Sequence, residues 1–151
     1  MRQRILVPVD LSAMSDAVVE AAADLARPLG AELRILHVFT PDDVADAQRE
    51  RGDTPQRFVE RLEESLRDLV RRRGVQADVE VCQGWSVPEQ ILETSRRWGA
   101  TFIVMGTHGR RGWRRVLLGS VAEEVLRHAS CPVLVIPAGA RRDSRPAAVA
   151  G

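Results

Sequence analysis

The sequence of 151 residues contains no lysine, no asparagine and no tyrosine. All 22 basic residues are therefore arginines, which excludes a Schiff-base lysine, a catalytic ammonium group and the lysine of a P-loop. Long apolar runs are also missing, so no segment approaches the roughly 20 residues that span a bilayer. Since no apolar segment of the secretory type follows Met1, we expect a cytoplasmic protein without a membrane partner.

The charge is almost balanced, with 22 basic and 21 acidic residues and a net charge of +1. Such a balance creates no overall field that would draw the chain to nucleic acid. Aromatic residues are also few, at three Trp and three Phe, so bases would find few stacking surfaces. We therefore expect no nucleic-acid partner.

The two cysteines, Cys82 and Cys131, lie far apart and form neither a C-x-x-C motif nor a metal-binding spacing. In a reducing cytoplasm we expect them to behave as small buried apolar side chains. The three histidines are also not spaced as metal ligands, so we expect no metal site made by the protein.

Short apolar strands alternate with amphipathic helices along the chain. This alternation predicts a single α/β domain over residues 1–138, with a five-stranded parallel sheet in the doubly wound order 3-2-1-4-5 and helices on both faces. We expect residues 139–151 to form a disordered tail. The polar connection 40–55 is the least determined part, and the pattern leaves open whether it is partly helical. The expected strands are 4–10, 33–38, 78–82, 101–105 and 132–137, and the expected helices are 13–29, 58–73 and two that begin at Ser86 and Ser120.

In this strand order the first and fourth strands flank the topological switch point, where such sheets bind ligands. Asp10 ends the first strand and Gly106 follows the fourth, so both are expected at this crevice. The same order places Cys82 and Cys131 on opposite edge strands, too far apart for a disulfide.

A glycine- and arginine-rich segment follows the fourth strand. Gly106 and Gly109 can present bare backbone N–H groups, and Gly119-Ser120 opens a helix whose N-terminus suits an anion. Arg110 and the arginines after it add guanidinium groups that bind phosphate well. The segment therefore predicts a phosphate site without lysine, provided that the intervening loop folds back on itself. It leaves open whether His108 contacts a phosphate.

The turn after the first strand has no glycine, in contrast to a dinucleotide-binding fingerprint. Its residues are Pro8, Val9, Asp10, Leu11 and Ser12. A carboxylate there suits hydroxyl or amino donors and repels phosphate. We therefore expect a nucleoside near the first two strands and phosphates near the fourth.

Together these segments resemble the universal stress protein family. Gly106-x2-Gly109-x9-Gly119-Ser120 matches its ATP-binding signature with the same spacing, and the strand ends Pro8-Val9-Asp10 and His37-Val38 are similar to those of the family. The closing segment 130–137 is also similar, so the resemblance extends over residues 1 to about 138.

The resemblance implies an ATP-binding stress-response regulator, with Mg²⁺ bridging the phosphates. It also implies a homodimer through antiparallel pairing of Val133 to Ile136, and a regulatory protein partner that the sequence does not identify. The resemblance further implies that Asp10 contacts the nucleoside and that the Val38 backbone contacts adenine. It also implies that Met105 and Gly106 line the base and the ribose. The residues that it implies around the phosphates are Gly109, Arg110, Gly119, Ser120 and Val121.

Other interpretations of the same residues stay open. Ser120 with Glu123 forms a capping box that needs no ligand, and Asp10 could cap the first helix. Trp85 and Trp98 are expected in the core on a helix face. No catalytic residue is predicted, so the alternatives to a regulator are a slow ATPase and a family member that binds proteins without nucleotide.

Overall fold

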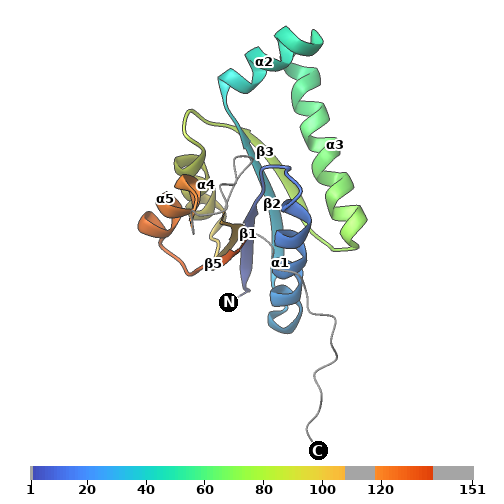
Figure 1. Cartoon of the computed structure of the whole chain (residues 1–151). Coiled ribbons are helices and arrows are strands. Elements are labelled where there is room, and N and C mark those ends of the chain that lie inside the picture. The colour runs from blue at the N-terminus through green and yellow to red at the C-terminus, as the bar shows by residue number, and fades with distance from the viewer. Residues whose placement is uncertain (1, 108–117, 138–151) are drawn as a thin grey trace, which may run out of the picture.

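The computed structural model of the protein describes residues 2–107 and 118–137. Five strands form one parallel sheet in the order β3-β2-β1-β4-β5 (Figure 1). This is the strand order that the sequence predicts. The strands are β1 (Arg4–Pro8), β2 (Glu32–Phe39), β3 (Asp78–Gln83), β4 (Phe102–Gly106) and β5 (Val133–Ile136).

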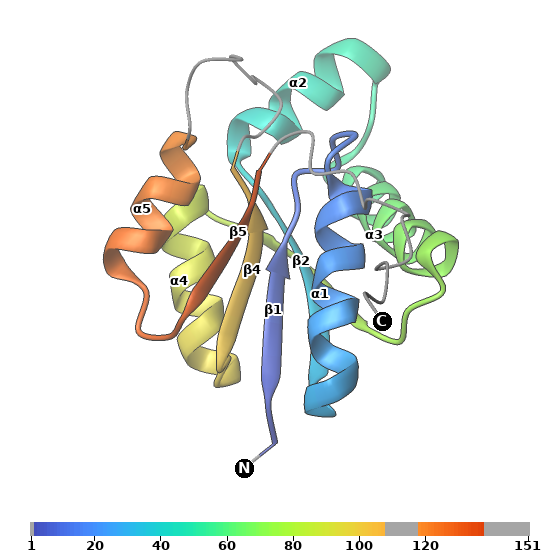
Figure 2. The same cartoon turned by 60° about the horizontal axis from the view of Figure 1, so that its bottom comes forward.

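Helices cover both faces of the sheet, as Figure 2 shows. Helices α1 and α3 pack on one face and α4 and α5 on the other. Each helix in the described ranges is too short or too polar to cross a bilayer. The helices are α1 (Ser15–Leu29), α2 (Pro41–Arg51), α3 (Pro55–Arg73), α4 (Val87–Trp98) and α5 (Ser120–His128).

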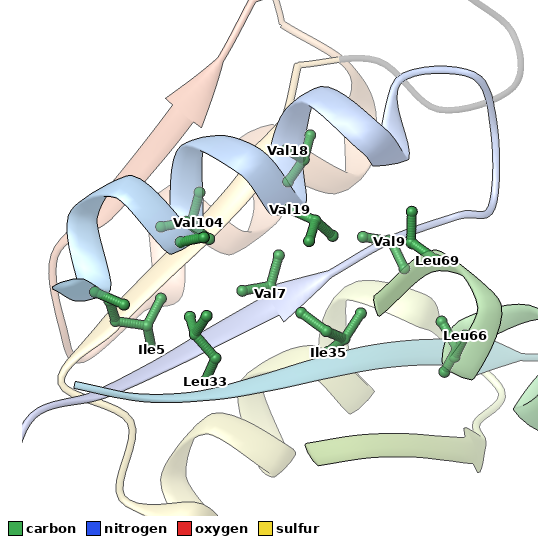
Figure 3. Close-up of a cluster of buried hydrophobic side chains, with 13 residues drawn as sticks. Ile5, Val7, Val9, Val18, Val19, Leu33, Ile35, Leu66, Leu69 and Val104 are labelled. Atoms are coloured by element: carbon green, nitrogen blue, oxygen red, sulfur yellow. The ribbon is translucent and has the colours of Figure 1, made fainter. Parts of the chain in front are cut away.

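The central strand β1 is buried on both sides, which explains its uninterrupted apolar sequence. Ile5 and Val7 point into the core beneath α1 and α3, together with Leu66 of α3 (Figure 3). Leu6 belongs to the second core, beneath α4 and α5. All four side chains are completely buried, so β1 is fixed from both faces.

Helix α2 occupies most of the connection that the sequence left undetermined. It begins with a capping box, in which the Thr40 hydroxyl accepts from the Asp43 N–H at 3.4 Å and the Thr40 N–H donates to Asp43 Oδ2 at 2.7 Å. No residue of α2 is buried. This agrees with its sequence, which lacks the apolar periodicity by which the other helices are recognised.

The expectation that Trp85 lies in the core is wrong, because its side chain is 88% exposed. Ser86 is the N-cap of α4, so Trp85 precedes the helix and has no place on its buried face. Trp98 is half-buried at the end of α4 and packs against the second core. The guanidinium of Arg34 lies over its ring, 4.7 Å from the centroid.

The two cysteines are free and lie at opposite edges of the sheet, as predicted. Both pack against the second core but are only half-buried, so the expectation that they are buried apolar side chains is met in part. Partial burial raises the pKa of the Cys82 thiol above its ordinary value, and the nearby Glu80 carboxylate raises it further. Cys82 therefore stays protonated at neutral pH and is a poor nucleophile.

Replacing Leu66 with alanine should lower the free energy of unfolding by about 2–5 kcal/mol, because the side chain is fully buried between α3 and the sheet. Leu29→Ala is the matched control on another helix, since Leu29 is 42% exposed, and it should cost less than about 1 kcal/mol. Urea unfolding of both variants measures the difference. Equal losses would contradict this assignment of the core.

Candidate functional site

A pocket of about 310 Å³ lies at the carboxyl ends of β1 and β4. The two strands pair through Ile5 with Phe102 and Leu6 with Ile103. Beyond these two pairs, β1 stays paired with β2 as far as Pro8, and β4 stays paired with β5 as far as Gly106. The central strands therefore part at their carboxyl ends, and the pocket lies where the doubly wound fold predicts a ligand.

The end of β1 forms one side of the pocket and is fixed by the neighbouring strand. The backbone N–H of Val9 donates to the carbonyl of Leu36 at 2.8 Å. The carbonyl of Val9 lies 2.8 Å from Nδ1 of the buried His37. Both main-chain groups of Val9 therefore have a hydrogen-bond partner, and this fixes the position of the backbone just before Asp10.

Asp10 lines the pocket, and only one of its two carboxylate oxygens has a hydrogen-bond partner among the described residues. Its Oδ1 accepts from the backbone N–H of Ser12 at 3.0 Å. Its Oδ2 is buried and has no hydrogen-bond partner among the described residues. A buried acceptor without a donor costs free energy, and a ligand O–H or N–H would satisfy it.

The structure also answers whether Asp10 merely caps the first helix. The N-cap of α1 is Met14, whose own side chain makes no capping hydrogen bond. Asp10 instead closes a tight turn onto Ser12, whose hydroxyl in turn accepts from the N–H of Met14 at 3.3 Å. The capping role is therefore excluded for Asp10, a residue that lines the pocket and whose second oxygen has no partner among the described residues.

Leu11, between Asp10 and Ser12, has a φ of 61°. Among the described residues it is the single non-glycine residue in the left-handed region, which L-residues adopt at a cost. Its side chain packs against the core beneath α1 and α3. This packing holds the turn in its strained conformation and so sets the position of Asp10.

The opposite side of the pocket is the N-terminus of α5. The N–H of Gly119 donates to the carbonyl of Thr107 at 2.5 Å, and the N–H of Thr107 donates to the carbonyl of Ile136 at 3.0 Å. The two ends of the glycine-rich loop therefore meet beside β5, as the fold-back hypothesis requires. Gly106, Thr107 and Gly119 all line the pocket.

The capping box predicted for Ser120 and Glu123 is wrong. Gly119 is the N-cap and provides no side chain, so Ser120 is the first helical residue. Glu123 accepts from Arg127 at 2.8 Å instead. The first hydrogen bond of the helix runs from the N–H of Glu123 to the carbonyl of Gly119, which leaves the three preceding N–H groups without helical acceptors.

These uncapped N–H groups belong to Ser120, Val121 and Ala122, which all line the pocket. Together with the positive end of the helix dipole they favour an anion there. The pocket thus combines an anion-binding end at α5 with a carboxylate acceptor at β1. Among the described residues no three His, Cys, Asp or Glu side chains gather as a metal-binding group.

Helix side chains that sequence reasoning missed complete the lining. Met14 and Val18 come from the start of α1, and Val87 and Ile91 from α4. Ser15 is also in the lining, although it is only 4% exposed. The sequence pattern did not identify them as site residues, because apolar helix positions and a serine near a helix start have ordinary structural explanations.

Eight of the predicted site residues line this pocket, and one does not. Val38 is buried in β2 within the second core and is not part of the lining. His108, Gly109 and Arg110 lie outside the described residues. The eight are Pro8, Val9, Asp10, Met105, Gly106, Gly119, Ser120 and Val121.

The chain matches the model of the universal stress protein family over residues 1–137. It is 31% identical to the universal stress protein YxiE of Bacillus subtilis over 149 residues, with coverage of 90% of this chain and 99% of the relative. The sequence resemblance thus extends over nearly the whole length of both proteins.

Solved structures give the same result for the fold. A universal stress protein family member from Burkholderia pseudomallei is 34% identical and superposes with a TM-score of 0.64, covering 90% of this chain and 96% of the other. The universal stress protein of Archaeoglobus fulgidus in complex with dAMP is 24% identical, with a TM-score of 0.64 and coverage of 89% and 97%. At this identity the second match supports the fold alone.

Replacing Leu11 with isoleucine should destabilise the protein by about 1 kcal/mol, because a β-branched residue tolerates the left-handed backbone least. Leu11→Met keeps both the apolar volume and the unbranched Cβ, so it should change the stability much less. Urea unfolding of the two variants makes the comparison. If isoleucine is tolerated as well as methionine, the turn is not strained in solution.

Proposed function

The chain belongs to the universal stress protein family, and on that premise we propose that it is an ATP-binding member, a cytoplasmic regulator whose state depends on nucleotide. The observation that carries the proposal is the composition of the pocket. A carboxylate with a free buried acceptor lies at one side, and an uncapped helix N-terminus lies at the other. A nucleotide has complementary groups at its two ends, since its nucleoside offers donors and its phosphates are anionic.

The phosphates are assigned to the side formed by α5. Backbone N–H groups of Ser120, Val121 and Ala122 are available there, and the bond between Gly119 and Thr107 keeps the helix start next to the end of β4. Further N–H and guanidinium donors are expected from Gly109 and Arg110. Mg²⁺ would arrive with ATP, held chiefly by phosphate oxygens.

The nucleoside is assigned to the side formed by β1. Asp10 would accept a hydrogen bond from it, while Pro8, Val9 and Met105 provide apolar surface. Val18 and Ile91 extend this surface from the two helix layers. An apolar pocket with a few convergent polar groups is typical of small-molecule sites. The proposed contact of the Val38 backbone with adenine would require the base to reach past this lining.

The nucleotide class also has support from relatives. The Archaeoglobus fulgidus protein of the same fold was solved with dAMP. That ligand is a nucleotide with a single phosphate, whereas the uncapped start of α5 and the expected arginine beside it suit a longer phosphate chain. For this reason we propose ATP for this chain.

Calorimetric titration of nucleotide-stripped protein with Mg-ATP should give micromolar binding. Gly119→Val should abolish it, because a branched side chain at the N-cap would obstruct the N–H groups at the start of α5. Leu126→Ala is the control on the same helix, since Leu126 is exposed and does not line the pocket, and it should bind like the original chain.

Circular dichroism of each protein establishes that it is folded. If the folded original chain binds no ATP, the proposal is wrong, and the family member that binds proteins without nucleotide becomes the better hypothesis. If Gly119→Val remains folded and binds ATP normally, the phosphates do not lie at α5.

We also propose that two copies pair through β5, the edge strand next to β4. The carbonyls of Pro132 and Ile136 accept hydrogen bonds from the β4 side. Because backbone groups alternate along a strand, those of Val133 and Val135 face the opposite side, away from β4. They form a row of donors and acceptors that a second copy could match in antiparallel pairing.

Val135→Pro should convert the dimer into a monomer, because it removes one outward N–H without removing a bond to β4. Val135→Ala keeps that N–H and should remain dimeric. Sedimentation velocity of both variants measures the state. A dimer that survives the proline variant would place the interface elsewhere on the molecule.

A further inference from the structure

Ser15 lines the pocket and carries an unmatched polar group. Its side chain is only 4% exposed, and its hydroxyl has no hydrogen-bond partner among the described residues. Its backbone N–H donates to the carbonyl of Ser12 at 3.0 Å, so the main chain is satisfied there and the hydroxyl alone is not. A buried hydroxyl in this condition lowers the stability of the ligand-free protein.

The second unmatched atom of the pocket is Oδ2 of Asp10. Six buried side-chain atoms lack partners among the described residues, and those from residues that line the pocket are Oδ2 of Asp10 and Oγ of Ser15. Both residues belong to the connection from β1 into α1 and are separated by five positions. The two unmatched oxygens therefore belong to residues that line one pocket and lie on one stretch of backbone.

The chemistry of these two oxygens restricts the ligand group that would satisfy them. A carboxylate only accepts hydrogen bonds, whereas a serine hydroxyl donates and accepts. A phosphate could accept from Ser15 but would repel Asp10. The adenine edge could donate from its amino group to Asp10 and accept from Ser15 at a ring nitrogen, a case that sugar analogues distinguish because they leave the base unchanged. A pair of neighbouring sugar hydroxyls provides both a donor and an acceptor.

We propose that Ser15 is a further ligand-binding residue, which together with Asp10 binds the adjacent 2′ and 3′ hydroxyls of a ribose. The site then selects ribonucleotides over deoxyribonucleotides. This inference rests on the proposed nucleotide-binding function and concerns this chain alone, since the relative solved with dAMP is only 24% identical.

Titrations of the original chain and of Ser15→Ala with Mg-ATP, 2′-deoxy-ATP and 3′-deoxy-ATP test the inference. The original chain should bind ATP about 3–10 times more tightly than the analogue that lacks the hydroxyl facing Ser15, as expected for one hydrogen bond. Ser15→Ala should weaken ATP binding by a similar factor. It should also bind ATP and that analogue equally.

Two further measurements separate binding from structure. Without ligand, Ser15→Ala should unfold at the same urea concentration as the original chain or at a higher one, because it removes an unmatched buried hydroxyl. Ser95→Ala is the matched control: Ser95 is also 4% exposed, and its hydroxyl lies 3.9 Å from the Cys131 sulfur, outside the pocket lining. This control should leave all three affinities unchanged.

The inference is overturned if the original chain binds ATP and both analogues equally, a result that needs no variant. It is also overturned if Ser15→Ala keeps the full preference for ATP, or if it weakens all three ligands equally. In these cases ATP still binds, so the proposed function survives. If the folded original chain binds none of the three, the proposed function fails and the inference fails with it.

Discussion

The short pairing between β1 and β4 is the constraint on which the rest of this molecule depends. It joins the two halves of the sheet through Ile5 with Phe102 and Leu6 with Ile103, and it then ends. Each strand continues along its outer neighbour, so the central strands separate at their carboxyl ends. Helices α1 and α5 lie on opposite faces of the sheet (Figure 2). Residues from the start of each helix line the pocket at the ends of β1 and β4.

The polar groups at this opening are only partly satisfied. The turn after β1 uses one oxygen of Asp10 and leaves the other without a donor, and α5 begins at a glycine that provides no cap. Leu11 adds a backbone conformation that is unfavourable by itself. Elsewhere the helices begin with side-chain caps, as at Thr40, Thr54 and Ser86. The pocket thus combines unsatisfied polar groups with a strained turn, and a bound ligand could compensate for both.

Much of this arrangement could be predicted from the sequence, because burial on both faces leaves a strong apolar pattern in the strands. The strand order and the switch point followed from that pattern, and eight of the predicted site residues line the pocket. Helix α2 could not be predicted with the same certainty, since it buries nothing. The cap of α5 was placed one residue late, because the motif of Ser120 and Glu123 fits a capping box that the backbone does not form. Ser15 gave no signal, since the lack of a partner for its hydroxyl depends on which atoms surround it.

The bond between Gly119 and Thr107 has a consequence for how such a domain can vary. The chain leaves the sheet after Thr107 and returns at Gly119, and these two points are in contact. A segment with adjoining ends can gain, lose or exchange residues at a small entropic cost and without moving the strands. The spacing between Gly109 and Gly119 is therefore a requirement of the proposed phosphate site, because the strands and the entropy of loop closure would tolerate other lengths. The frame of the sheet thus permits connections of other lengths, and ligand binding is the constraint that would hold this one.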